Sequence, residues 1–164
     1  MRRVAIAAGA ALVCGACSVF GGLGASKVTR LDEPTVRAFA ASQEAAWNAH
    51  DFDRFYATVA PDAVFVSVRW NADGTITRES RTPKEDRTAA EHYFQTHPGK
   101  FTEVADIDRI EIAPDGLSAH VVGHQTARIE SSPKPSVLRA TTELTVVLRG
   151  GRVLSLGQTD TAVR

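Results

Sequence analysis

The sequence predicts one α+β domain, in which helices are segregated from an antiparallel sheet. Apolar residues at helical spacing occur only before residue 98. Four long β-rich segments follow, and tight-turn signals separate them. Helices followed by a run of meandering strands are typical of the α+β class. A chain of 164 residues has the length of one domain with an independent core.

Capping residues and apolar spacing place the first two helices. The first covers residues 32–50, with Asp32 as its cap and apolar side chains at helical spacing as far as Trp47. A second, short helix covers residues 51–59, and Pro61 is expected to break it.

A third helix and two turn signals complete the predicted order. The helix opens at Thr82, which can form a capping box with Glu85, and Pro98-Gly99 is expected to end it. Gly74 closes one predicted turn, and Gly150-Gly151 is a strong hairpin signal. The strands are predicted at residues 63–70, 75–80, 101–113, 117–130, 137–149 and 152–163.

The first 17 residues predict export. Arg2 and Arg3 precede a ten-residue apolar run, which is too short to span a bilayer and has the length of a secretory signal core. Two small residues then precede Cys17, and the segment resembles a bacterial lipoprotein signal, although Cys14 stands where such signals usually have Leu. The resemblance implies lipidation at Cys17 and a protein anchored in the cell envelope on the periplasmic face. The alternative is a soluble periplasmic or secreted protein, cleaved within residues 21–25.

The remaining chain divides into a tether and a domain. Residues 18–31 begin with a small, Gly-rich stretch that indicates a flexible tether, and residues 32–164 form the domain. Removal of residues 1–17 leaves 17 basic and 19 acidic residues, which lacks the basic footprint of a nucleic-acid-binding protein. No spacing of His, Cys or acidic residues indicates a metal site, and no cofactor is expected.

Short motifs in the first half of the domain carry a family resemblance. Residues 47–53 read WNAHDFD, Tyr56 follows, and residues 60–65 read APDAVF. This pattern resembles the nuclear transport factor 2-like superfamily and, within it, the SnoaL-like group. The resemblance implies a cone-shaped, curved antiparallel sheet packed on three helices, a single pocket, and a homodimer through the sheet.

The resemblance also tests for a known catalytic set. In the ketosteroid-isomerase branch an Asp ends the first strand, but ungapped counting places Ser67 there. The branch's helix Tyr falls on Gln43, and its late-strand Asp falls on Glu143 or Thr142. A core-facing row beginning at Leu144 favours Thr142. The isomerase set is therefore absent, and no catalytic residue is assigned.

Eight residues are candidates for lining the pocket. They are Gln43, Trp47, Tyr56, Phe65, Ser67, Tyr93, His124 and Asp160. For three of them the structural alternative is plain: Gln43 at an exposed edge of the helical stripe, His124 on a solvated sheet face, and Asp160 at a solvated strand end. His50 and His97 suit helix ends, where a cation is favoured. The charged run from Arg78 to Arg87 is interpreted as solvated surface.

Three functions remain open from the sequence. The first is a non-enzymatic envelope lipoprotein that binds a small apolar ligand or a protein partner. The second is a SnoaL-like pocket enzyme, such as a cyclase, dehydratase or hydrolase acting on a polyketide- or steroid-like compound. The third is a dimeric assembly or scaffold module. Convergence of polar candidates in one place would favour the enzyme.

Overall fold

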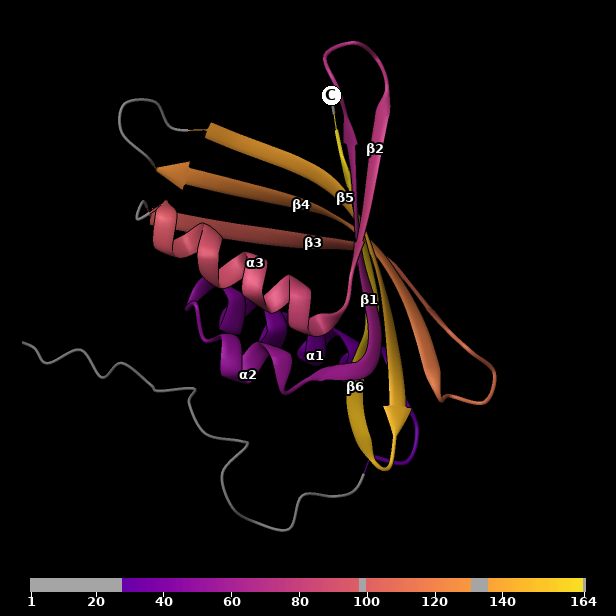
Figure 1. Ribbon diagram of the computed structural model, residues 1–164. Helices are drawn as coiled ribbons and strands as arrows, with labels where there is room; N and C mark the ends of the chain where they lie inside the picture. The colour runs from indigo at the N-terminus through magenta and orange to yellow at the C-terminus, as the bar shows by residue number, and fades with distance from the viewer. Residues whose placement is uncertain (1–27, 98–99, 131–135, 164) are drawn as a thin grey trace, which may run out of the picture.

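The computed structural model describes residues 28–97, 100–130 and 136–163. Within these ranges it confirms the α+β class: a strongly bent six-stranded sheet carries three helices on one side (Figure 1). We call the side that faces the helices the inner face and the other the outer face. The predicted signal segment with Cys17, most of the tether, Pro98-Gly99 and residues 131–135 between two predicted strands lie outside the described residues.

The helices and strands of the described chain follow the predicted order closely. They are α1 (Glu33–Asn48), α2 (Phe52–Tyr56), β1 (Val59–Trp70), β2 (Ile76–Arg81), α3 (Pro83–Thr96), β3 (Lys100–Ile112), β4 (Ser118–Glu130), β5 (Ser136–Arg149) and β6 (Arg152–Ala162).

The sheet is mixed, which corrects the expectation of an antiparallel one. Its strand order is β2-β1-β6-β5-β4-β3, and β1 pairs with β6 in parallel, whereas all other pairs are antiparallel. The chain leaves β2, crosses through α3 to the far edge at β3, and returns strand by strand until β6 reaches β1. A parallel pair requires such a long crossover connection.

Local signals explain the ends of the elements. Asp32 caps α1 by accepting from Thr35 N at 2.8 Å. The capping box of Thr82 and Glu85 is present at the start of α3. The second helix is shorter than predicted, because β1 already begins at Val59. Pro61, which lacks an N–H, falls in the irregular register between Val59 and Val64, where a strand tolerates proline.

Two buried clusters hold the helices on the inner face. One joins α1 to β4 and β5 through Leu31, Val36, Ala119, Val121, Leu144 and Val146. The other joins α1 and α2 to β1, β5 and β6 through Ala46, Phe55, Val59, Ala60, Ala63, Val147 and Leu154. Leu144 and Val146 confirm the predicted core-facing row of β5.

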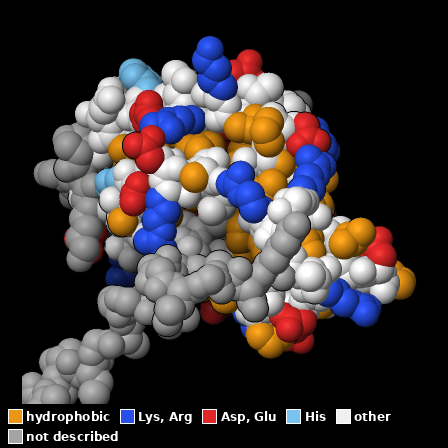
Figure 2. Space-filling model, turned by 90° about the horizontal axis from the view of Figure 1, so that it is seen from below, with side chains coloured by type: hydrophobic (Ala, Val, Ile, Leu, Met, Phe, Trp, Pro, Cys, Tyr) orange, Lys and Arg blue, Asp and Glu red, His pale blue; other side chains and the backbone are white. Residues whose placement is uncertain are grey.

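On the face seen from below in Figure 2, side chains of one charge do not gather into a patch. Basic and acidic side chains are interspersed there with exposed hydrophobic ones (Figure 2). Among the described residues, no helix is long and apolar enough to cross a membrane.

Gly157 is required where β6 meets β1. A Cβ atom at this position would lie 2.5 Å from the carbonyl oxygen of Val64. We therefore expect Gly157→Ala to lower the free energy of unfolding by roughly 1–3 kcal/mol, because the backbones must separate. Urea denaturation measures the change. Thr161→Ala in the same strand is the control and should cost less than about 0.5 kcal/mol; equal effects of the two variants would contradict the steric explanation.

Candidate functional site

A row of polar side chains crosses the inner face of the sheet. It runs from Glu103 in β3 through Gln125 in β4 and Thr142 in β5 to Asp160 in β6, with Gln158 next to it. In the sheet register Glu103 is paired with Ala127 and Ala105 with Gln125. Thr142 is paired with Asp160. All five side chains of the row are half-buried. We call these five residues, Glu103, Gln125, Thr142, Gln158 and Asp160, the acid network.

Hydrogen bonds connect four of the five members of the acid network, and the fifth, Glu103, lies next to Gln125. The Thr142 hydroxyl lies 2.8 Å from Asp160 Oδ1 and 3.1 Å from Gln125 Oε1. Gln158 Nε2 donates to both oxygens of Asp160, at 3.0 and 2.9 Å. Gln125 and Glu103 are diagonal neighbours on the inner face of adjacent strands, within reach of each other's side chains, and Gln125 lowers the pKa of the Glu103 carboxyl. A row of neighbouring polar side chains therefore lies between two carboxyl groups that are three strands apart.

The position of Glu103 is fixed by the end of α1. Asn48 Nδ2 donates to the backbone oxygen of Glu103 at 2.7 Å, and Glu103 N donates to Asn48 Oδ1 at 2.7 Å. Since β3 is an edge strand, these backbone groups have no strand partner on that side. One asparagine thus supplies both missing hydrogen bonds and ties the strand to the helix.

The environment of Glu103 favours the protonated acid. Burial raises the pKa of its carboxyl to about 7, and the negative charges of Asp160 and Glu44 add to the rise, whereas Gln125 and Trp47 oppose it. The indole N–H of Trp47 is buried, meets no partner at hydrogen-bonding geometry, and still lies near enough to Glu103 to lower the pKa. A buried donor without a good acceptor indicates a place for a further polar atom.

Asp160 has a similar environment. Burial raises the pKa of its carboxyl, and the charge of Asp86 raises it further, although Thr142 and Gln158 donate to it. Asp86 lies in α3 and accepts from the Tyr56 hydroxyl at 2.8 Å. Burial raises the pKa of Asp86 as well, and it raises the pKa of Tyr56. A third carboxyl thus approaches the acid network from the helical side.

Basic partners are scarce around these carboxyls. Within the described part of the chain, neither Glu103 nor Asp160 forms an ion pair with Lys or Arg. Asp86 has only a long contact with Arg81, at 3.7 Å. An isolated buried carboxylate is expensive, and burial without a cation therefore shifts each group toward its neutral form.

Several predicted pocket residues lie around the acid network. Ser67 is the register partner of Asp160 on the neighbouring strand β1. Phe65, two residues earlier, packs edge-on against Tyr56. Trp47 contacts Phe94, and Tyr93 of α3 packs against Phe94 and stacks on His97.

Gln43 lies in the core and does not join this group. Its amide nitrogen donates to Thr58 Oγ1 at 3.0 Å and to Ser155 Oγ at 3.3 Å, and it is only 7% exposed. The structure therefore corrects the prediction of Gln43 as a pocket residue, because partners inside the protein meet its hydrogen-bonding needs.

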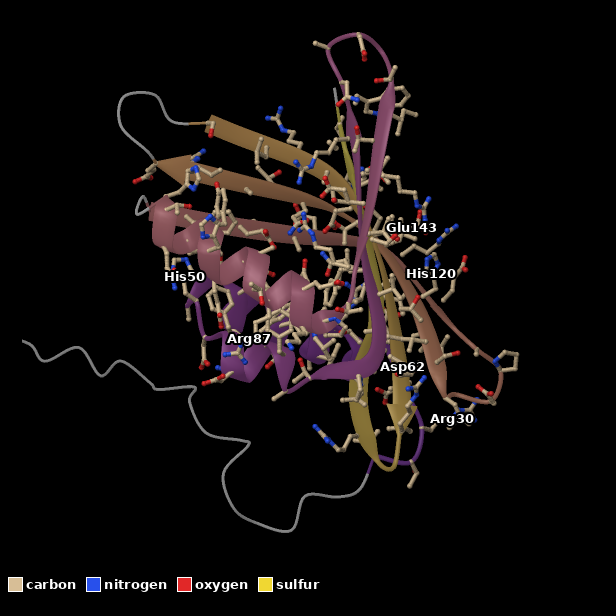
Figure 3. All side chains as sticks on the ribbon, in the orientation of Figure 1. Arg30, His50, Asp62, Arg87, His120 and Glu143 are labelled. Carbon is tan, nitrogen blue, oxygen red and sulfur yellow. The ribbon has the colours of Figure 1, made fainter. Side chains whose placement is uncertain are left out.

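His124 is also removed from the predicted pocket. Its side chain is 62% exposed and pairs with Asp108. Successive side chains of a strand point to opposite faces, so that Gln125 takes the inner position and His124 the outer one. His120 pairs with Glu143 on this outer face, and Figure 3 shows both pointing away from the helices. His124 lies on the exposed face, as its structural alternative stated, and Thr142, not Glu143, faces inward.

The comparisons with known proteins agree with this architecture. The family model described as a SnoaL-like domain matches residues 36–156. The chain belongs to the SnoaL-like domain family. No curated protein matches the chain.

Solved structures similar to the SnoaL-like domain share its fold. Aln2 from a Streptomyces species is 22% identical, with 77% of this chain and 87% of that chain covered and a TM-score of 0.60. The beta subunit of benzoate 1,2-dioxygenase from Burkholderia mallei is 12% identical, with 81% and 91% covered and a TM-score of 0.64. An NTF-2 like protein of unknown function from Shewanella oneidensis is 18% identical, with 77% and 95% covered and a TM-score of 0.54. The TM-scores show that these proteins share the fold of this domain.

Sequence reasoning missed four residues of the candidate site. Glu103, Gln125 and Gln158 are single polar residues within strands, and of these only Gln125 has a local signal, because it alternates in phase with the buried Val121 and Ile129. Asp86 was assigned to a solvated charged run, yet it lies four residues before Ala90 and seven before Tyr93, on the buried stripe of α3. That helical spacing was the signal that could have identified it.

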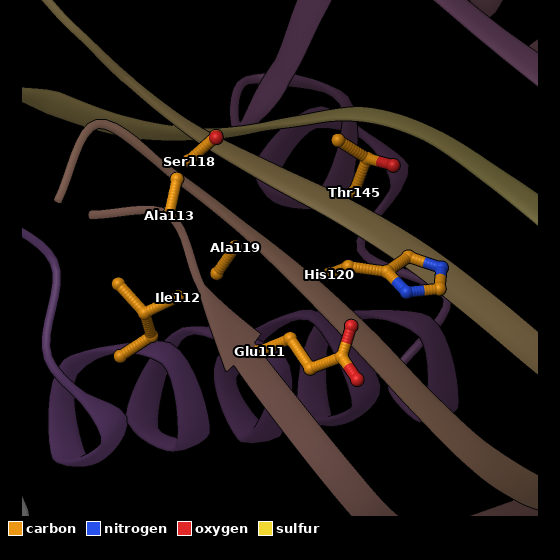
Figure 4. Close-up of a pocket in the computed structure, with 7 residues that line it drawn as sticks. All are labelled: Glu111, Ile112, Ala113, Ser118, Ala119, His120 and Thr145. Carbon is orange, nitrogen blue, oxygen red and sulfur yellow. The ribbon is translucent and has the colours of Figure 1, made fainter. Parts of the chain in front are cut away.

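Surface hollows elsewhere on the domain carry less chemistry. The hollow in Figure 4 is shallow and open, and is lined by Glu111, Ile112, Ala113, Ser118, Ala119, His120 and Thr145. Its titratable groups already have partners, since Glu111 meets Arg109 and His120 meets Glu143. A second shallow hollow surrounds the turn from Trp70 to Gly74. Among the described residues no group of three ligands suits a metal ion.

The raised pKa of Glu103 predicts a pH-dependent stability. The unfolded chain ionises this carboxyl at its ordinary pKa, whereas the folded protein resists ionisation until about pH 7. The contribution of Glu103 to stability is therefore fully present below pH 4.5 and is lost as the pH rises through 7. We expect Glu103→Gln to be more stable than the wild type by about 1–3 kcal/mol at pH 8 and nearly equal to it at pH 5.

Urea denaturation at the two pH values measures this difference. Glu33→Gln, an exposed residue of α1 that pairs with Arg37, is the matched control and should leave the pH dependence between pH 5 and 8 unchanged. A Glu103→Gln variant whose stability changes with pH as steeply as that of the wild type would show that Glu103 ionises normally.

Proposed function

We propose that the SnoaL-like domain binds a small, uncharged organic molecule against the inner face of its sheet and acts on it by acid–base catalysis. Glu103 serves as the base, and Asp160 holds a proton at the other end of the site. The observation that carries this proposal is the pair of half-buried carboxyls on one row of polar side chains, without a cationic partner in the described part of the chain.

The acid–base role follows from the cost of this arrangement. Two half-buried carboxyls without cations do not stabilise the fold. Apolar side chains in their place would remove the cost of taking two acidic groups out of water. A general base works best when its pKa lies near the working pH, because both protonation states are then populated. A carboxyl with a pKa of about 7 satisfies this condition.

Chemistry and spacing indicate the class of substrate. Anions are disfavoured by three neighbouring acidic groups, and the aromatic rings of Trp47, Tyr56 and Phe65 suit an apolar ring system. Adjacent strands lie about 4.8 Å apart, so that the backbones of β3 and β6 are roughly 14 Å apart. A molecule of two or more rings can reach toward both carboxyls, which agrees with the polyketide- or steroid-like compounds that the family resemblance implies.

The reaction that fits best begins next to a carbonyl group. Glu103 removes a proton from the carbon beside the carbonyl, and the electron pair moves toward the carbonyl oxygen. A protonated Asp160 supplies a proton at a distant atom of the conjugated system. Cyclisation and dehydration of oxygenated ring compounds both need a proton to be removed at one place and added at another.

Proton exchange on a model ketone tests this function and does not require the natural substrate. We expect the protein to accelerate deuterium incorporation at the activated carbon of 2-tetralone in D₂O, followed by ¹H NMR. Glu103→Gln should lower the catalysed rate by roughly 10²-fold or more, because the base is lost. His124→Ala, on the outer face, is the control and should keep the wild-type rate.

Binding without catalysis is the second candidate, and the aromatic rings beside the acid network favour it. Saturation-transfer NMR with the same ketone separates the two functions. Bound ketone without accelerated exchange would support a binding domain, whereas exchange that survives Glu103→Gln would remove this residue from the base role.

The protein is further proposed to act outside the cytoplasm, anchored in the membrane through a lipid on Cys17. The apolar run after Arg2-Arg3 and the small residues before Cys17 support this location. Two acyl signals are needed for firm anchoring, because one chain binds a bilayer only marginally. The domain begins close behind the tether, where Leu31 N bonds Gly116 O at 2.8 Å.

Metabolic labelling with palmitate in a bacterial host tests the anchor. We expect the full chain to incorporate the label and to sediment with membranes, and Cys17→Ser to lose both properties. Cys14→Ser is the matched control and should behave as the wild type. Equal labelling of the wild type and Cys17→Ser would place the modification elsewhere.

A further inference from the structure

The central hydroxyl of the acid network has one proton and two acceptors. Thr142 Oγ1 lies within hydrogen-bonding distance of both Asp160 Oδ1 and Gln125 Oε1. A threonine hydroxyl donates only one hydrogen bond, although its oxygen can accept others. When both carboxyls are ionised, one of the two acceptors therefore lacks the Thr142 proton.

Protonation of Asp160 satisfies every bond in one direction. The Asp160 O–H donates to Thr142 Oγ1, and the Thr142 hydroxyl donates to Gln125 Oε1. The Gln125 Nε2–H is then free to donate to the neighbouring Glu103 carboxylate. In this state Asp160 is an acid and Glu103 is a base.

Protonation of Glu103 satisfies every bond in the opposite direction. If the Gln125 amide turns over, the Glu103 O–H donates to Gln125 Oε1, the Gln125 Nε2–H donates to Thr142 Oγ1, and the Thr142 hydroxyl donates to Asp160. The network thus has two complete arrangements, and each of them contains one carboxyl proton.

We propose that Thr142 and Gln125 act as positioning residues that couple Glu103 to Asp160, so that the site keeps one proton and holds its two carboxyls in opposite states. The proposal rests on the acid–base function proposed above. Thr142 and Gln125 couple the two carboxyls by reversing the direction of their hydrogen bonds. The carboxyl proton itself does not travel through them.

The coupling completes the proposed reaction with its protons balanced. A substrate C–H bond breaks and a Glu103 O–H bond forms. The network then reverses, which favours ionised Asp160, and the Asp160 O–H bond breaks as a new bond from that proton to the substrate forms. The substrate loses one proton and gains one, and the protein ends with the proton at Glu103, from which solvent resets it.

The groups that surround the pair bias this equilibrium from every side. On the helical side these are Glu44 and the Trp47 indole of α1, together with Asp86 of α3, which is bonded to Tyr56 and faces Arg81. On the sheet side, Gln158 of β6 donates to Asp160 and not to Glu103, and Ser67 of β1 lies beside Asp160. Gln158 favours an ionised Asp160, and the Trp47 indole favours an ionised Glu103.

Carboxyl titrations followed by ¹³C NMR on the protein alone test the coupling. Asp160→Asn removes the charge and leaves an amide that can donate to Thr142, which fixes the network in its first arrangement. We expect this change to lower the pKa of Glu103 by about 1 unit when Thr142 is present. In a Thr142→Val background, where only the direct charge effect remains, the same change should lower it by no more than roughly half as much.

Three further variants keep the result decisive. Thr142→Ser retains the hydroxyl and should restore the full shift, whereas Gln125→Leu should reduce it as Thr142→Val does. Thr141→Val, on the outer face of the same strand, should leave it unchanged. Equal shifts with and without the Thr142 hydroxyl would overturn the proposal. These titrations need no ligand, so that their failure is distinct from a failure of the ketone-exchange experiment.

Discussion

Two hydrogen bonds between Asn48 and the backbone of Glu103 determine where the acid network can form. They close the exposed edge of β3 on the last residue of α1, and they leave the Glu103 side chain directed to the inner face. The same helix end places Trp47 next to the carboxyl. An edge strand without this attachment would have free N–H and C=O groups and a weakly determined position. The chemistry of the site therefore depends on a single asparagine that touches no carboxyl oxygen.

The Asp160 carboxyl accepts hydrogen bonds from neutral donors and not from cations, so that burial can raise its pKa. Asp62 shows the contrast within the same protein: it is exposed, it pairs with Arg149, and that arginine holds its pKa below the ordinary value. Asp160 also receives two donors, but they are a hydroxyl and an amide, and burial outweighs them, so that its pKa rises. Neutral donors orient a carboxyl without fixing it as an anion. Replacement of Gln125 or Thr142 by a basic residue would therefore be expected to abolish acid–base chemistry while improving the local charge balance.

The elements were predictable wherever their signals are local. The capping box at Thr82 and Glu85 and the hairpin at Gly150-Gly151, whose two glycines both have positive φ, follow from a few adjacent residues. The site depends on long-range pairing and was therefore less predictable. Glu103 lies among alternating residues of which the apolar Val104 is the more exposed, and its partner Asn48 is 55 positions away. His124 and Gln125 are adjacent and equally polar, and only the alternation with buried residues such as Val121 and Ile129 indicates that Gln125 faces inward.

The parallel pairing of β1 with β6 is the step that completes the site. It brings Asp160, near the end of the chain, beside Ser67 in the first strand, whereas the antiparallel pairs from β3 to β6 carry the acid network across four consecutive strands. Two carboxyls that share one proton usually lie in direct contact, where the repulsion between their like charges raises the pKa of one of them. Here the two groups lie three strands apart, so that one proton can be shared only through the side chains between them. This separation favours a reaction in which a proton leaves one end of a substrate and another arrives at its far end.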